Sequence, residues 1–136
     1  MEGRVRVDRR FDWVGPPDRT SKIRSILLRR VDNETALERD YREAREQLNK
    51  WNSDFWTRHN TLFDDKKSRF IEMKKAQLGP LETVSANELS RFYRDFLNER
   101  HPAMMAYNKE WYCRNLALIW PALKVNVVRF VRLLKR

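Results

Sequence analysis

Three residues of this 136-residue chain have side chains that could ligate a haem or respond to oxidation: His59, His101 and Cys113. A single His or Cys can ligate haem iron, and a cation such as Arg114 beside Cys113 favours a reactive thiolate. Each residue also has a structural interpretation. His59 falls on the apolar side of a predicted helix, His101 precedes a proline at a predicted helix start, and Cys113 lies at a helix edge. The structural interpretation is the simpler one, and haem or redox chemistry is the alternative hypothesis.

The sequence contains no recognisable catalytic or metal-binding constellation. There is no glycine-rich phosphate loop, no zinc-ligand spacing, no nucleophile elbow and no HExxH motif. The single cysteine excludes an internal disulfide and a copper-carrying cysteine pair. A pI near 10.2 is compatible with nonspecific binding to nucleic acid, but no zinc finger, basic zipper or RNP-like strand is present. We therefore predict a protein that is not an enzyme, holds no metal and binds no specific nucleic acid, with haem as the one cofactor left open.

The stretch from His101 to Pro121 carries most of the candidate binding residues. Pro102 suits the first turn of a helix, where a missing N–H costs nothing. Helical spacing then gives one apolar face, which we expect to pack in the core, made by Met105, Trp111, Tyr112, Leu116 and Ile119. Asn108 and Asn115 fall near the middle of that face. Because an unpaired buried amide costs about 1–3 kcal/mol, they predict an internal hydrogen-bond network or, alternatively, a binding surface.

A long amphipathic helix is the strongest pattern in the first half of the chain. We expect it to begin near Asn33, which can cap it. Its apolar positions recur every three or four residues, as one stripe: Leu37, Tyr41, Ala44, Leu48, Trp51, Phe55, His59 and Leu62. A second helix is expected to open at Asp64–Asp65 and to end at Gly79–Pro80.

Two more helices are predicted before the C-terminus. The Ser85–Glu88 capping box opens one of them, which we expect to end near Asn98. The other starts at Pro102 and bends at Pro121. The expected fold is all-α, a three- or four-helix bundle, with the helical part spanning residues 33–136.

Residues 1–32 form a basic, extended N-terminal arm in this prediction. Gly15-Pro16-Pro17 cannot be helical, so we expect a rigid turn there, with Trp13 pinning the arm to the helices. Residues 23–31 follow as an extended segment, since a lone strand would have no partner.

The positive charge lies at the two ends of the chain. Residues 1–30 hold nine Lys/Arg against four Asp/Glu, residues 121–136 hold five against none, and the middle holds fifteen of each. Such ends attract anionic surfaces. The C-terminal segment, apolar on one side and cationic on the other, predicts either an interfacial membrane helix or one more helix of the bundle. No run reaches the roughly 18 uncharged apolar residues of a membrane span, and no secretory signal is visible.

Four stretches of the chain, taken in order, resemble the motifs of the mitochondrial apoptogenic-protein family, also called the cytochrome c oxidase assembly factor eight family. They are DWVGPPD (residues 12–18), WNSDFW (51–56), FYRDFL (92–97) and YNKEWYCRN (107–115), within a resemblance that extends to about residue 121. The resemblance implies a small helical protein on the matrix face of the mitochondrial inner membrane. It implies a non-enzymatic role in the assembly or stability of cytochrome c oxidase (complex IV), with links to apoptosis and oxidative stress.

The aromatic and Asn-bearing residues and the basic C-terminal segment are the surfaces that we expect to bind. The expected contacts with assembly intermediates are Trp13, Trp56, Asn108, Trp111, Tyr112 and Asn115. The expected peripheral contacts with the inner membrane are Lys124, Arg129, Arg132 and Lys135. The alternative is a haem-binding carrier with a redox-sensitive thiol in the same pathway. A long presequence is expected in this family, whereas this sequence begins twelve residues before Trp13, so the location rests on the resemblance.

Overall fold

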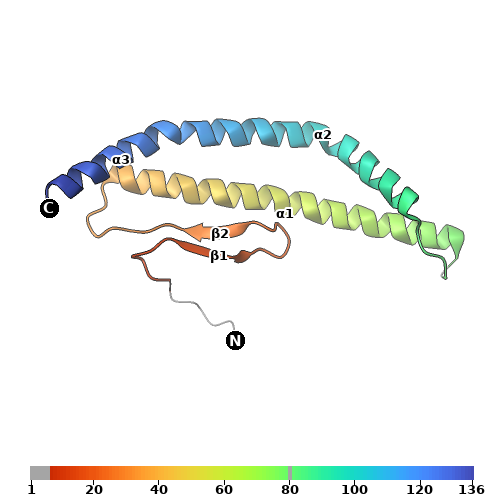
Figure 1. Ribbon diagram of the computed structural model, residues 1–136. Coiled ribbons are helices and arrows are strands. Elements are labelled where there is room, and N and C mark those ends of the chain that lie inside the picture. Colours follow the sequence, from red (N-terminus) through yellow and green to blue (C-terminus); the bar gives the residue numbers. More distant parts are fainter. Residues whose placement is uncertain (1–6, 80) are drawn as a thin grey trace.

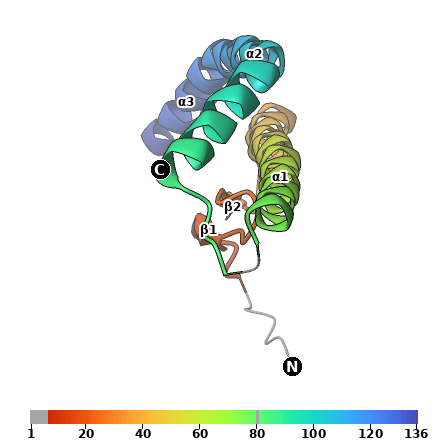
Figure 2. The same cartoon turned by 90° about the vertical axis from the view of Figure 1, so that its right-hand side faces the viewer.

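The fold is a helical hairpin with a small β-hairpin on one side. The computed structural model describes residues 7–79 and 81–136. Its elements are β1 (Trp13–Pro17), β2 (Arg24–Leu27), α1 (Ala36–Leu78), α2 (Ala86–Ala117) and α3 (Ile119–Leu134). Figure 1 shows three layers, with α1 between the strands and the α2–α3 pair. Figure 2 looks along the helices and shows α1 and α2–α3 as two separate rows. The predicted helical class is confirmed, but α2 and α3 form one bent rod running back along α1, so the expected three- or four-helix bundle is wrong.

α1 runs without interruption through the point at which the sequence suggested a break. Asp64 and Asp65, expected to start a second helix, lie exposed inside α1, where no Gly or Pro interrupts the backbone. The N-cap is Thr35, two residues after the predicted Asn33, and it forms a capping box with Glu38. The predicted apolar stripe is confirmed, since each of its side chains is buried or half-buried.

α2 begins at the predicted capping box of Ser85 and Glu88. Its predicted end near Asn98 is wrong, because the helix continues through Pro102. Pro102 and Asn98 are both exposed, so the carbonyl group that loses its N–H partner can be hydrated. Figure 1 shows α2 bent along its length, as an internal proline requires. A second bend separates α2 from α3 at Leu118, three residues before the predicted position.

The N-terminal arm forms a β-hairpin. β1 pairs antiparallel with β2, with Trp13 opposite Leu27 and an irregular register between Val14 and Pro17. The predicted turn at Gly15-Pro16-Pro17 is therefore a strand, and the segment thought to lack a partner pairs with it. A two-stranded sheet has only edge strands, so the missing N–H groups of the prolines are tolerated. Gly15 is required because a Cβ atom there would lie 2.6 Å from the Trp13 ring.

The arm docks onto α1, as predicted, but polar contacts hold it. Ser21 of the arm is only 2% exposed. The contacts are Ser21 Oγ with Ser53 Oγ (2.8 Å), Asn60 Nδ2 with the Thr20 carbonyl (2.8 Å), Asn49 Nδ2 with the Arg24 carbonyl (2.9 Å) and Leu28 N–H with Glu46 Oε1 (3.0 Å). Trp13 instead covers Gly15 within the hairpin.

The core between α1 and α2 is a chain of aromatic side chains. The Tyr107 ring stacks on Phe55 and Trp51, with ring centroids 4.1 and 5.3 Å apart. Its hydroxyl accepts a 3.1 Å hydrogen bond from Trp56 Nε1 and donates to Asn52 Oδ1. Phe96 continues the cluster toward the connection between α1 and α2, through contacts with His59 and Phe63. This interlocked packing fixes the rotation of α2 about its own axis, and hence the side that it turns to solvent.

Candidate functional site

α2 and α3 are apolar on two opposite sides, and only one of them faces α1. The packed side is made by Phe96, Tyr107, Leu118, Val125 and Val128. The opposite side, which we call the outer apolar face, consists of Met105, Tyr112, Leu116, Ile119, Leu123, Val127, Phe130 and Leu134. All eight side chains are more than half exposed, from 52% at Leu123 to 71% at Leu134. They recur every three, four or seven residues, so they form one stripe along the solvent side of the rod.

The expectation that Met105, Trp111, Tyr112, Leu116 and Ile119 pack in the core is wrong. Four of these side chains belong to the outer apolar face, and Trp111 at 38% exposure lies at its edge. The predicted internal amide network is wrong as well. Asn108 is exposed, and Asn115 Nδ2 donates to the Trp111 carbonyl of its own helix at 2.7 Å. Asn108 is therefore available at the surface, whereas Asn115 is half-buried and bonded to its own helix.

Cations border the outer apolar face on α3. At 100° per residue, Lys124 falls on one flank of the stripe and Arg129 on the other, and Lys135 and Arg136 follow the end of the helix. Lys124 Nζ lies 5.3 Å from the centroid of the Trp120 ring, which is itself exposed. Residues 121–136 contain no carboxylate side chain. An apolar stripe flanked by cations is the arrangement of an interfacial helix.

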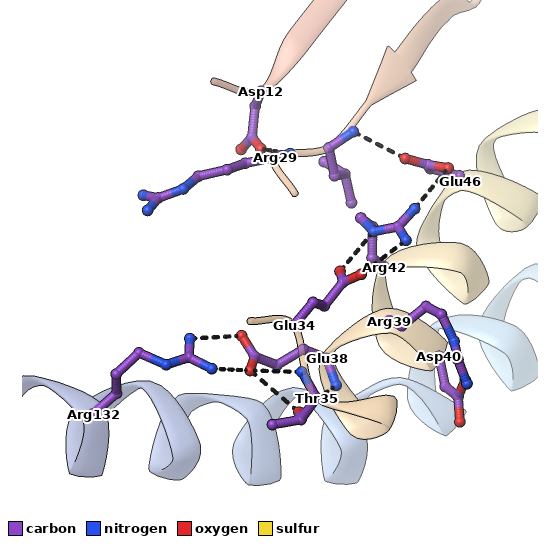
Figure 3. A network of polar contacts seen from close by, with 11 residues as sticks. Asp12, Arg29, Glu34, Thr35, Glu38, Arg39, Asp40, Arg42, Glu46 and Arg132 are labelled. Atoms are coloured by element: carbon purple, nitrogen blue, oxygen red, sulfur yellow. Dashed lines mark hydrogen bonds and ion pairs between the residues drawn. The ribbon is translucent and has the colours of Figure 1, made fainter. Parts of the chain in front are cut away.

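Arg132 has a different role from the other basic residues of α3. Its guanidinium binds both carboxylate oxygens of Glu38 on α1, at 2.5 and 3.1 Å, and donates to the Asn33 carbonyl (Figure 3). Glu38 is only 4% exposed. The Arg132 hydrogen bond, followed by those from Thr35, lowers the pKa of Glu38 below its usual 4.5. The pair clamps the end of α3 onto the start of α1. Glu38 is not among the site residues predicted from the sequence, although Thr35 and Glu38 have capping-box spacing.

The six residues expected to bind a partner do not form one group. Four of them lie within two turns of α2: Asn108, Trp111 and Tyr112, which are exposed, and Asn115, which is half-buried. Trp56 belongs to the aromatic core through its bond to Tyr107, and Trp13 lies in the β-hairpin. The structure therefore brings four of the six together.

His59 is a buried core residue, 7% exposed. Its ring lies against Phe55, Trp56 and Phe96, with centroids 5.3 to 6.1 Å away. Burial, and then the nearby charge of Arg100, lowers the pKa of His59 below 6.5. His59 Nδ1 has no hydrogen-bond partner among the described residues. This enclosed position agrees with the structural interpretation of His59, and its haem role stays a prediction.

We expect the stability of the protein to fall as the pH drops below 6.5. The unfolded chain takes up a proton at His59 near pH 6.5, whereas the folded chain resists it until a lower pH, so unfolding is favoured on acidification. His59→Phe keeps an aromatic ring and removes the titration. Urea unfolding of both proteins between pH 7.5 and 5 measures the difference. Equal pH slopes for parent and variant would contradict this account.

The other two candidates for haem or redox chemistry are exposed. His101 and Cys113 lie on α2, twelve residues apart, at the surface. In residues 7–79 and 81–136, no group of three His, Cys, Asp or Glu side chains could hold a metal ion. Haem binding therefore stays a prediction, without support from the positions of these residues. Within the same part of the chain, no helix has the length and hydropathy of a membrane span.

Comparison with known proteins shows the family. Residues 11–131 match the family described as cytochrome c oxidase assembly factor 8. The chain is 75% identical to a mitochondrial COA8 family protein of Caenorhabditis elegans, over 97% of this chain and 93% of that protein. It is 33% identical to human cytochrome c oxidase assembly factor 8, over 92% of this chain and 65% of the human protein. No solved structure matches. On the strength of these matches, the chain belongs to the cytochrome c oxidase assembly factor 8 family.

Proposed function

We propose that this protein is a non-enzymatic mitochondrial assembly factor for cytochrome c oxidase, and that it acts at the matrix face of the inner membrane. The names of its relatives support the assembly role and the organelle. The outer apolar face carries the rest of the proposal. Large apolar stripes on a protein surface mark contacts with a membrane or another protein.

The two halves of the outer apolar face favour different contacts. On α3, exposed apolar side chains lie between cations with no carboxylate in residues 121–136, which suits an anionic membrane surface. On α2, Asn108 and Tyr112 mix hydrogen-bonding groups with apolar area, and Glu110 and Arg114 form a 2.8 Å ion pair nearby. Mixed polar and aromatic surfaces are typical of protein interfaces. We assign the α3 half to the membrane and the α2 half to an assembly intermediate.

The membrane contact can be tested with the triple variant Val127→Gln, Phe130→Gln, Leu134→Gln. All three side chains are exposed, so the variant should fold. Because each apolar side chain that enters a membrane is worth about 1–2 kcal/mol, binding to vesicles of phosphatidylcholine and cardiolipin should fall roughly tenfold or more. A matched control is Met73→Gln, Leu78→Gln, Leu81→Gln, which changes three exposed apolar residues at the other end of the molecule. Equal vesicle binding by parent and triple variant would remove α3 as the membrane contact.

The assembly role has its own measurement with the same proteins. In cells that lack the protein, assembled cytochrome c oxidase on native gels should fall. The parent and the control variant should restore it, and the α3 variant should not. If loss of the protein leaves the amount of assembled oxidase unchanged, the proposed function is wrong.

A further inference from the structure

A groove rich in arginine lies where the N-terminal arm, the start of α1 and the end of α3 meet. Its volume is about 880 Å³, within the usual range of small-ligand sites. Eight arginines and four carboxylates line it. The arginines come from all three segments: Arg10, Arg29 and Arg30 from the arm, Arg42 and Arg45 from α1, and Arg129, Arg132 and Arg136 from α3 and the residues after it.

Three of the lining carboxylates already have partners. Arg42 binds both oxygens of Glu34, at 2.8 and 3.1 Å, and Arg132 binds Glu38 (Figure 3). Asp12 accepts the backbone N–H of Arg29 at 2.7 Å. The two ion pairs hold the walls of the groove together. Asp12 and Asp32 are the two lining carboxylates that form no ion pair among the described residues.

Five lining arginines have no acidic partner within the described part of the chain: Arg29, Arg30, Arg45, Arg129 and Arg136. All five are exposed. In Figure 3 the Arg29 guanidinium extends away from the network of dashed contacts. Arg45 lies over the Tyr41 ring, 5.8 Å from its centroid, which orients that side chain beside the groove. Five such arginines outnumber the two lining carboxylates that form no ion pair, so the groove has a net positive charge that favours an anion.

We propose that this groove binds a ligand with phosphate groups through Arg29, Arg30, Arg45, Arg129 and Arg136. A guanidinium binds phosphate oxygens in bidentate fashion, and a tetrahedral phosphate accepts such bonds from several directions at once. Walls that converge from three segments suit this compact ligand better than an extended acidic peptide, which would follow one wall. Phe11, Val31 and Leu133 add apolar surface to the groove, so the ligand carries an apolar part next to its phosphate groups. An anionic phospholipid headgroup and a free organic phosphate share this chemistry.

The inference does not rest on the proposed function, and its test uses residues outside the outer apolar face. The groove variant is Arg29→Gln, Arg30→Gln, Arg45→Gln. The control variant, Arg19→Gln, Arg58→Gln, Arg69→Gln, removes the same charge from exposed positions that do not line the groove. All six arginines are exposed, so equal melting temperatures of the two variants should show that both fold. The probes are inorganic pyrophosphate, measured by calorimetry, and vesicles of phosphatidylcholine with cardiolipin, measured by sedimentation.

The groove variant should bind a phosphate probe roughly tenfold or more weakly than the parent, with the control variant close to the parent. A loss for pyrophosphate identifies a site open to free phosphates. A loss confined to cardiolipin vesicles identifies a lipid headgroup as the source of the phosphate. Equal binding of both probes by the two variants would overturn the proposal, because the arginines would then add only general charge. Tighter binding of poly-glutamate than of either phosphate probe would overturn it in favour of an acidic peptide.

Discussion

Replacing Phe96 by Ala should lower the free energy of unfolding by about 3–5 kcal/mol. Phe96 is 3% exposed on α2, and its ring lies 5.1 Å from that of Phe63 and 5.4 Å from that of His59, both on α1. Truncation leaves a cavity between two helices that have few other deeply buried side chains. Native domains have a free energy of unfolding of about 5–15 kcal/mol, so this change would remove a large share of the stability. Urea unfolding followed by circular dichroism measures the change.

Leu97 provides the control for Phe96. It is the next residue of the same helix but is 57% exposed, so Leu97→Ala makes a similar change of helix propensity without a cavity. Its effect should stay within about 0.5 kcal/mol. Equal losses for the two variants would show that the packing of α2 on α1 differs from the one described here.

Glu38→Gln should destabilise the protein by about 2 kcal/mol, the usual worth of a hydrogen bond to a charged group. Gln keeps the size of Glu and can still complete the capping box with Thr35, so the variant removes only the charge that binds Arg132. Because this pair clamps the end of α3 onto α1, hydrogen exchange of the α3 backbone amides should rise more than that of α2. Glu72→Gln, an exposed change on the same helix α1, should leave both measurements near the parent.

The same ion pair predicts a second step of acid sensitivity. The pKa of Glu38 is lowered from 4.5 in the folded state, so the folded chain binds fewer protons than the unfolded chain as the pH falls. The stabilisation by this group is complete above pH 4.5 and is lost progressively below it. Glu38→Gln should flatten the stability profile below pH 4.5, whereas His59→Phe should flatten it between 6.5 and the lower pKa of the folded state. A Glu38→Gln profile parallel to that of the parent at low pH would contradict the clamp.

Local signals in the sequence determined the helices and several of their ends. The stripe from Leu37 to Leu62 faces its partner as predicted, because a helix with apolar residues on a single side has only one way to bury them. The capping box at Ser85 opens α2 because it satisfies backbone groups within four residues. The cations of residues 121–136 likewise come directly from composition. The predictions on the domain boundary and on the binding roles of individual residues remain predictions.

Only tertiary structure decided which side of α2 and α3 is buried. Both sides are apolar, so helical periodicity alone does not distinguish the exposed Met105 and Leu116 from Tyr107 and Val125, which pack against α1. The aromatic stack of Tyr107 on Trp51 and Phe55, together with the clamp at Glu38, selects one side. The pairing of β2 with β1 and the groove of arginines could not be predicted from the sequence for a related reason. They join segments far apart in the chain, and a local pattern carries no information about which distant residues will meet.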